Sequence, residues 1–343
     1  MSIHKHKIAV IGSGAVGGFY GSLLAKSGCE VSFLIHSDFE NISKQGLKIE
    51  SIWGDFGVLP YSKETLNNDK IFNPNSINSC QAYFVNDSKN FNSNIDTILI
   101  ALKSTENLSL ASLLKPFESI SIQKKLQIVL IQNGIGQELL IHELLPFAKV
   151  YAGLAFLCSV KKSPNCIQHM DYGDLTLAES SKEEAACGVG AEMQTLGKLL
   201  QKAGIPITLE DDLVLARWKK LVWNIPFNGL SVLLNAETDR MVQNQDSLTL
   251  VRDLMAEVQL AAKAEGKLIP TSFLDDRVNK TFSMKPYPTS MKLDYENGRK
   301  MELDGIYRSV LERAQSSHTS LPNIKFLFHA LEYLEKNKST DKK

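Results

Sequence analysis

The sequence predicts an α/β domain in residues 1–209 followed by an all-helical domain in residues 210–337. Three observations lead to this fold class. A glycine-rich turn follows the first apolar run, apolar runs of strand length recur as far as Leu209, and from Asp211 onward apolar residues recur at helical spacing. A chain of 343 residues is long enough for two domains that each have a hydrophobic core.

The first strand and the turn after it carry the main motif of the α/β domain. Ile8 to Ile11 is a short β-branched run, typical of a strand buried on both faces. The turn Gly12-Ser13-Gly14-Ala15-Val16-Gly17 has G-x-G-x-x-G spacing, and a helix and a second strand come next. The glycines allow a tight turn, close approach of a pyrophosphate and close helix packing. This order predicts a Rossmann-type dinucleotide site; the alternative is a glycine-rich turn without a ligand.

The end of the second strand, Glu30 to Ile35, bears on which dinucleotide binds. A site that prefers NAD usually has an acidic residue there to hold the ribose hydroxyls. Here the position is His36, followed by Ser37, and Asp38 stands where it would cap the next helix. Because no carboxylate would repel a 2′-phosphate, the sequence favours NADP, with NAD as the alternative.

Two later strands place polar residues at the ligand-binding edge of the predicted sheet. Lys103 follows the apolar run Asp96 to Leu102, and Asn133 follows the run Gln127 to Ile131. In open α/β sheets the carboxyl ends of the strands face the ligand. We therefore expect Lys103 and Asn133 near the cofactor; the alternatives are a solvated lysine and a simple Asn-Gly turn.

The remaining segments of the α/β domain give weaker signals. Residues 46–95 are poorly periodic and predict short antiparallel strands and loops, with a surface excursion at 73–94. Two further strands are expected at 150–156 and 173–178, then a helix at 192–203 and a last strand at 205–209. His169 lies in the connection between the first two and has no visible partner, so we expect a structural role for it.

Composition excludes several classes of protein. Lys plus Arg equals Asp plus Glu at 38 each, so no net field attracts nucleic acid or an anionic membrane. No apolar run reaches the roughly 18 residues of a membrane span, and the first strand leaves no room for a signal peptide before it. The 5 cysteines lack C-x-x-C spacing, which predicts reduced thiols in a cytoplasmic protein and no metal; a Cys158–Cys166 pair across a hairpin is the alternative.

The first helix of the second domain, expected from Asp211 to Leu234, carries a row of polar residues. Lys220, Asn224 and Asn228 follow one another at i, i+4 and i+8, so they share one helix face. Lys219 lies about 100° away around the helix and is expected to be solvated. One ammonium and two amides on an otherwise apolar helix could hold a carbonyl and a hydroxyl; the alternative is a polar stripe facing solvent.

Further helices are expected at 247–265, 273–281, 298–316 and 324–336, with a frayed charged end at 336–343. Two residues late in this domain could also serve a ligand. Ser290 precedes a helical turn and Glu302 begins a helix. From position alone, each is better explained as a helix cap.

These motifs together resemble one family. The glycine turn, Lys103, and Gln132-Asn133-Gly134 suggest it, and Lys220-x3-Asn224-x3-Asn228 followed by Ser290-Met291 and Glu302 completes the pattern. Over nearly its whole length the chain resembles the ketopantoate reductases (2-dehydropantoate 2-reductases). The resemblance implies a Rossmann domain joined to a helical domain like that of 6-phosphogluconate dehydrogenases, with substrate in the cleft between them.

The resemblance also implies roles for individual residues. Lys220 would be the general acid, and Glu302 would orient the substrate and lie near the cofactor. Asn224, Asn228 and Ser290 would bind substrate, while Lys103 and Asn133 would shape the cofactor side. The chain departs from the family pattern at His36, where arginine is common, and at Met301, where threonine is frequent.

The predicted function is the NADPH-dependent reduction of 2-dehydropantoate to pantoate, on the route to pantothenate and coenzyme A. Two alternatives stay open: a reductase of another small 2-oxo acid, and a non-catalytic NADPH-sensing protein. The polar row of Lys220, Asn224 and Asn228 argues against the sensor, because a protein that only binds NADPH would need no general acid. The sequence leaves open whether the protein is a monomer or a homodimer.

Overall fold

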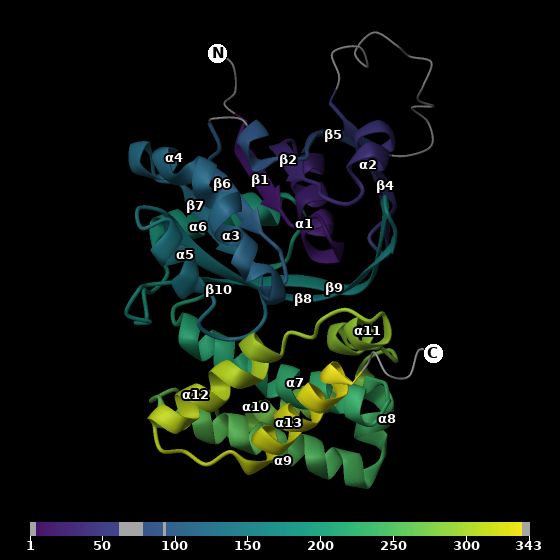
Figure 1. The fold of residues 1–343 in the computed structure, drawn as a ribbon, viewed down its shortest axis with the longest axis vertical. Coiled ribbons are helices and arrows are strands. Elements are labelled where there is room, and N and C mark those ends of the chain that lie inside the picture. Colours follow the sequence, from purple (N-terminus) through teal and green to yellow (C-terminus); the bar gives the residue numbers. More distant parts are fainter. Residues whose placement is uncertain (1–4, 62–77, 92–93, 338–343) are drawn as a thin grey trace. The chain divides into compact units, whose positions relative to one another are not determined.

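The computed structural model describes residues 5–61, 78–91 and 94–337 (Figure 1). The chain forms two compact units. Unit 1 comprises Met1–Gln132 and Glu138–Asp211, and unit 2 comprises Asn133–Gln137 and Asp212–Lys343. The short loop Asn133–Gln137 therefore clusters with the helices, although it lies within the stretch that the sequence assigned to the α/β domain.

Unit 1 is built on one sheet, which has ten strands among the described residues, in the order β10-β9-β3-β4-β5-β2-β1-β6-β7-β8. Its strands are β1 (Lys7–Ile11), β2 (Glu30–Leu34), β3 (Leu47–Ser51), β4 (Phe56–Pro60), β5 (Asn78–Val85), β6 (Thr97–Ile100), β7 (Gln127–Leu130), β8 (Lys149–Ser163), β9 (Cys166–Glu179) and β10 (Ile207–Glu210). β1 pairs in parallel with β2 on one side and β6 on the other. The turns after β1 and β6 thus lie at the point where the strand order reverses, the usual place for a ligand.

Helices pack on both faces of the parallel strands, because β1 alternates its side chains between two hydrophobic cores. Ile8 and Val10 join one core with residues of α1 (Ala15–Lys26) and α6 (Ala191–Lys202). Ala9 and Ile11 join the other with α3 (Asn107–Leu114) and α5 (Glu138–Leu144). The shorter helices α2 (Phe39–Gln45) and α4 (Glu118–Gln123) complete the unit (Figure 1). This arrangement is the predicted doubly covered α/β domain.

The segment 46–95 contributes more to the sheet than the sequence predicted. β3 and β4 form the expected antiparallel pair. β5, however, pairs in parallel with both β4 and β2, so the described part of 73–94 is no surface excursion. Residues 73–77 and 92–93 lie outside the described residues. Hydrophobic periodicity missed β5 because backbone pairing to two neighbours, and not a regular apolar face, makes it a strand.

Unit 2 is helical in its described part, as predicted. Its α-helices are α7 (Leu213–Leu233), α8 (Thr238–Gln243), α9 (Gln245–Ala264), α10 (Thr271–Ser283), α11 (Ser290–Glu296), α12 (Ser309–Ser316) and α13 (Pro322–Lys336). A π-helical turn, η4 (Asp304–Arg308), precedes α12. The sequence did not anticipate α8 or the π-turn, and it expected only a helical turn at Ser290, where α11 forms. Its charged C-terminal end, 336–343, lies outside the described residues from 338 onward.

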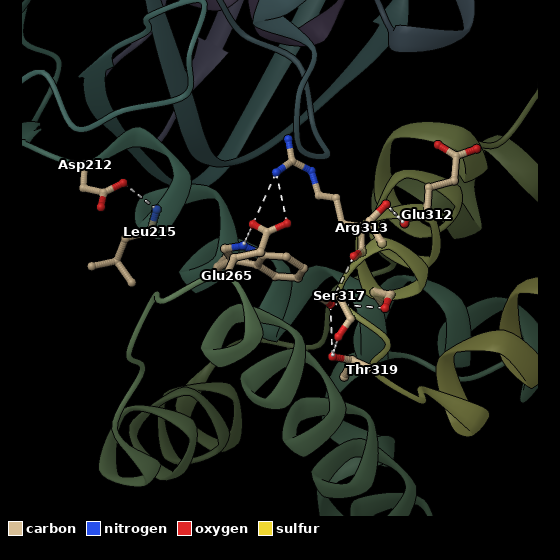
Figure 2. Close-up of polar contacts among 10 residues, drawn as sticks. Asp212, Leu215, Glu265, Glu312, Arg313, Ser317 and Thr319 are labelled. Atoms are coloured by element: carbon tan, nitrogen blue, oxygen red, sulfur yellow. Dashed lines mark hydrogen bonds and ion pairs between the residues drawn. The ribbon is translucent and has the colours of Figure 1, made fainter.

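Polar anchors hold the N-terminal part of α7. The Asp212 side chain caps the helix by accepting from the Leu215 N–H at 3.0 Å. Glu265, just after α9, accepts from the Trp218 indole at 2.9 Å and from Arg313 of α12 at 3.2 Å (Figure 2). These contacts and the apolar core around Trp218 fix α7 before its polar row begins.

Candidate active site

The glycine turn has the geometry that a dinucleotide site requires. Gly12 has φ +95°, which a residue with a side chain rarely adopts. A Cβ on Gly17 would lie 2.1 Å from the Gly12 carbonyl oxygen, so helix α1 can pack this closely only with glycine there. A Cβ on Gly14 would meet nothing within 4 Å. Gly14 is therefore open backbone at the N-terminus of α1, where a pyrophosphate could approach.

The strands β2 and β6 flank β1, the strand that leads into this turn. The Ser13 hydroxyl donates to the Leu34 carbonyl at 3.0 Å, which ties the glycine turn to the end of β2. His36 is exposed just beyond β2. Asp38 occupies the N-cap position of α2, but its side chain does not cap the helix; it pairs with Lys161 at 2.5 Å instead. Lys103 is partly buried after β6, at the start of the 3₁₀ turn Ser104–Glu106.

The polar row on α7 lies within one continuous helix. Asn224 and Asn228 are buried, and Lys220 is partly buried. Among the described residues, neither asparagine amide has a hydrogen-bond partner, and neither is one of the fully buried polar groups left without one, so both amides are accessible to a ligand. Amides in this state, spaced along one face, are suited to bind a polar ligand. Lys219 is partly exposed, with the same intermediate burial as Lys220.

The electrostatic environment of Lys220 separates it from an ordinary surface lysine. Burial lowers the pKa of Lys220 from 10.5 to about 7, and the Arg217 guanidinium contributes in the same direction. The Glu302 carboxylate acts in the opposite direction and raises that pKa. Removing a charged amine from water disfavours its protonated form, which explains the direction. An amine with a pKa near neutrality can donate a proton and be reprotonated at physiological pH.

Glu302 is held from the loop that clusters with the helices. The Asn133 amide donates to the Glu302 carboxylate at 3.0 Å. The Ile135 N–H donates to the Gly305 carbonyl at 3.2 Å, and a Cβ on Gly134 would lie 2.2 Å from that same oxygen. The Asn133-Gly134 dipeptide, for which a simple turn was the alternative, therefore packs this loop against the residues that follow Glu302.

Ser290 is exposed at the first position of α11. The sequence suggested that its hydroxyl could cap this helix, but Thr289 does so by accepting from the Lys292 N–H at 3.2 Å. Thr289 also bonds Ser231 of α7 at 2.7 Å. Since the cap is already provided, the Ser290 hydroxyl is left on the surface of α11, where it can serve a ligand.

Comparison with known proteins bears directly on this arrangement. Residues 8–182 match the family described as ketopantoate reductase PanE/ApbA, and residues 212–335 match its C-terminal part. The chain belongs to the ketopantoate reductase family. It is thus a pyridine-nucleotide-dependent oxidoreductase of the ketopantoate reductase type, as the sequence motifs predicted.

Individual ketopantoate reductases support this assignment along the whole chain. A 2-dehydropantoate 2-reductase from Nostoc sp. is 42% identical over 97% of this chain and 96% of its own. The crystal structure of 2-dehydropantoate 2-reductase from Geobacter metallireducens has a TM-score of 0.82 and 32% identity, covering 95% of this chain and 99% of its own. A dimeric ketopantoate reductase from Staphylococcus aureus shares the fold, with a TM-score of 0.73 at 20% identity over 97% of this chain and 100% of its own.

Other candidates for chemistry have structural explanations. His169 is buried, with Nδ1 2.8 Å from the Ser51 hydroxyl and Nε2 2.8 Å from the Tyr172 carbonyl, which fits the structural role predicted for it. The five cysteines are free thiols, and Cys158 lies opposite Asp171 and not Cys166 across the β8–β9 hairpin. No helix among the described residues is long and apolar enough to span a membrane.

Two residues near the row were missed by the sequence analysis. Arg217, three residues before Lys220 and buried, was visible in Arg-Trp-Lys-Lys, and its i, i+3 spacing could have indicated its effect on the Lys220 charge. Tyr307 contacts α7 from a distant segment, and no sequence signal could have found it.

Proposed function

We propose that this ketopantoate reductase uses NADPH to reduce 2-dehydropantoate to pantoate, on the route to pantothenate and coenzyme A. One observation carries the proposal: an ammonium whose pKa is about 7 shares a helix face with two asparagine amides that no described residue hydrogen-bonds. This set of groups can bind a small oxygen-rich molecule and protonate one of its oxygens. The family membership of the chain makes a 2-oxo acid the natural substrate.

The residues of unit 2 would act in sequence on the bound 2-oxo acid. Asn224, Asn228 and Ser290 would hold the substrate oxygens through hydrogen bonds. Lys220 would first polarise the ketone, and its Nζ would then give a proton to the oxygen as negative charge develops there. Glu302, oriented by Asn133, would position the substrate hydroxyl and support the protonated state of Lys220.

Unit 1 would hold the cofactor. The open backbone at Gly14, together with Gly12, Ser13, Ala15, Val16 and Gly17, fits a pyrophosphate at the N-terminus of α1. His36 would lie beside the 2′-phosphate, and Lys103 would contribute to the cofactor side. When bound, NADPH supplies the hydride that reduces the ketone carbon. Residues 1–209 would thus form the dinucleotide domain and residues 210–337 the substrate and catalytic domain.

We place the enzyme in the cytoplasm, as a monomer or homodimer, with a small 2-oxo acid as its ligand and no nucleic acid, membrane or metal partner. The second candidate function is reduction of another small 2-oxo acid, since the row of amides recognises oxygens that all such substrates share. A non-catalytic NADPH sensor is the third, and the perturbed pKa of Lys220 argues against it.

A steady-state assay that follows NADPH absorbance tests the proposal. Ketopantoate is compared with pyruvate and with a larger branched 2-oxo acid, each with NADPH and with NADH. We expect ketopantoate with NADPH to give the highest kcat/KM, and this value to fall as the pH rises above about 7, where Lys220 loses its proton. NADPH binding without turnover of any 2-oxo acid would support the sensor instead.

A further inference from the structure

Tyr307 forms a hydrogen bond with the backbone of α7. The side chain is fully buried, and its hydroxyl donates to the Ile225 carbonyl at 2.9 Å. Gly229, which has no Cβ, lies against the same hydroxyl. Residues 225 and 229 are four apart, so their carbonyl and N–H are the pair that an ideal α-helix would join directly. The Ile225 carbonyl at this step of the helix therefore also accepts from a side chain of another element.

This hydrogen bond lies between the two asparagines of the proposed substrate-binding row. Ile225 and Gly229 each follow one of the two row amides, Asn224 and Asn228. In the same turn Pro226 has no N–H to donate to the Val222 carbonyl. The Val222 carbonyl therefore lacks its usual helical donor, and the Ile225 carbonyl in the next turn is held by a side chain from another element.

The space around the Tyr307 hydroxyl fits this side chain closely. A Cβ on Gly229 would lie 2.6 Å from the Tyr307 hydroxyl oxygen and 2.6 Å from Leu327 of α13. Tyr307 itself sits in η4, the π-helical turn that begins two residues after Glu302. Such turns are rare and often occur at functional sites. One side chain therefore connects the segment that carries Glu302 to the middle of the Lys220–Asn228 row.

We propose that Tyr307 is a positioning residue of the substrate site, whose hydroxyl sets the spacing of Asn228 relative to Asn224 and Glu302. This inference rests on the substrate-binding role proposed above for Asn228. Without the hydroxyl, the anchor on the Ile225 carbonyl would be lost, and the turn that carries Asn224 and Asn228 would be free to shift. Tyr307 does not touch the reacting atoms; it acts through the amide that does.

The test uses the full-length enzyme and the variant Tyr307→Phe, which removes one oxygen and leaves the ring in its place. We expect kcat/KM for ketopantoate to fall about 10- to 100-fold, as small displacements of binding groups do. The NADPH dissociation constant, measured by fluorescence titration, should stay within about twofold because the glycine turn is unchanged. In a double-mutant cycle, Tyr307→Phe should add little to Asn228→Ala, because both changes disable the same contact.

Glu257→Gln provides the control for a loss of stability alone. Glu257 of α9 is buried and accepts from the N–H groups of Asn323 and Ile324 at the start of α13, each at 2.8 Å. Its amide variant should lower the melting temperature without changing kcat/KM. Equal kinetic losses in Glu257→Gln and Tyr307→Phe would overturn the positioning role, as would full additivity in the cycle or an unchanged kcat/KM in Tyr307→Phe. If Asn228→Ala is as active as the unmodified enzyme, the proposed site itself is wrong.

Discussion

The glycine turn of unit 1 and the polar row of unit 2, both proposed above as binding sites, are built in two different ways. The turn offers backbone, and its three glycines satisfy requirements that arise within a few residues: a positive φ, an open approach and a close helix contact. The row offers side chains, whose properties depend on residues far along the chain. Burial and Arg217 lower the pKa of Lys220, and Glu302 raises it. Tyr307, from a distant segment, donates a hydrogen bond to the backbone of the same helix.

The difference shows why the two sites should respond differently to substitution. A backbone site loses function when a side chain is added, because added atoms occupy ligand space or force the turn apart. A side-chain site loses function when atoms are removed, because the chemistry resides in the removed group. The following predictions use this contrast, beginning with the largest effect.

Lys220→Ala should reduce turnover about 10²- to 10⁴-fold, the range for losing a general acid. Lys219→Ala, one residue away on a different face, should change turnover less than about threefold, since such substitutions usually cost under about 0.5 kcal/mol. Both variants should bind NADPH normally, because the glycine turn is untouched. Steady-state kinetics with a cofactor titration on each variant provides the measurement. If Lys219→Ala were the inactive variant, the general acid would be Lys219 and not Lys220.

Alanine at two glycines should separate ligand approach from packing. Gly14→Ala enters open space, so the free energy of unfolding should change by less than about 0.5 kcal/mol, while NADPH affinity falls about tenfold or more. Gly17→Ala would place a Cβ 2.1 Å from a carbonyl oxygen and should lose both affinity and more than about 2 kcal/mol of stability. Urea unfolding and fluorescence titration distinguish the two. Unchanged NADPH affinity in Gly14→Ala would mean that the pyrophosphate does not approach there.

His36→Asp should change which dinucleotide unit 1 prefers. A carboxylate after β2 would repel the 2′-phosphate and accept the ribose hydroxyls of NADH, so the preference for NADPH should fall about tenfold or reverse. The ratio of the two kcat/KM values, measured in parallel for both proteins, reports the change. Equal values in the unmodified enzyme would show that the missing acid does not select NADP.

The smallest effect concerns stability and pH. In the folded protein the pKa of Lys220 is about 7, below its ordinary 10.5, so the unfolded chain binds more protons between these values. Lys220 therefore destabilises the fold fully below pH 7, and this cost disappears as the pH rises toward 10.5. Lys220→Met should raise the melting temperature by about 2–4 °C at pH 6 and by less at pH 10. A gain that is the same at both pH values would contradict the buried-charge explanation.

Much of the fold and part of the candidate site could be predicted because they depend on local chain properties. The β1–turn–α1 unit follows from adjacent residues, and the α/β domain followed by helices follows from hydrophobic periodicity. The positions of Lys220, Asn224 and Asn228 on one face follow from the helical repeat alone. The sequence by itself therefore determined the fold class, the family and the residues proposed to act.

The tertiary structure decided the environment of these residues. It inserted β5 between β4 and β2, placed the loop Asn133–Gln137 among the helices, and made Thr289 the cap of α11. It also buried Lys220 and brought Tyr307 to Ile225, 82 positions away along the chain. Such contacts join segments that are far apart in the sequence, and no local sequence pattern predicts which of these segments will meet. A pKa or a side-chain hydrogen bond depends on which atoms surround a group, and only the folded chain supplies them.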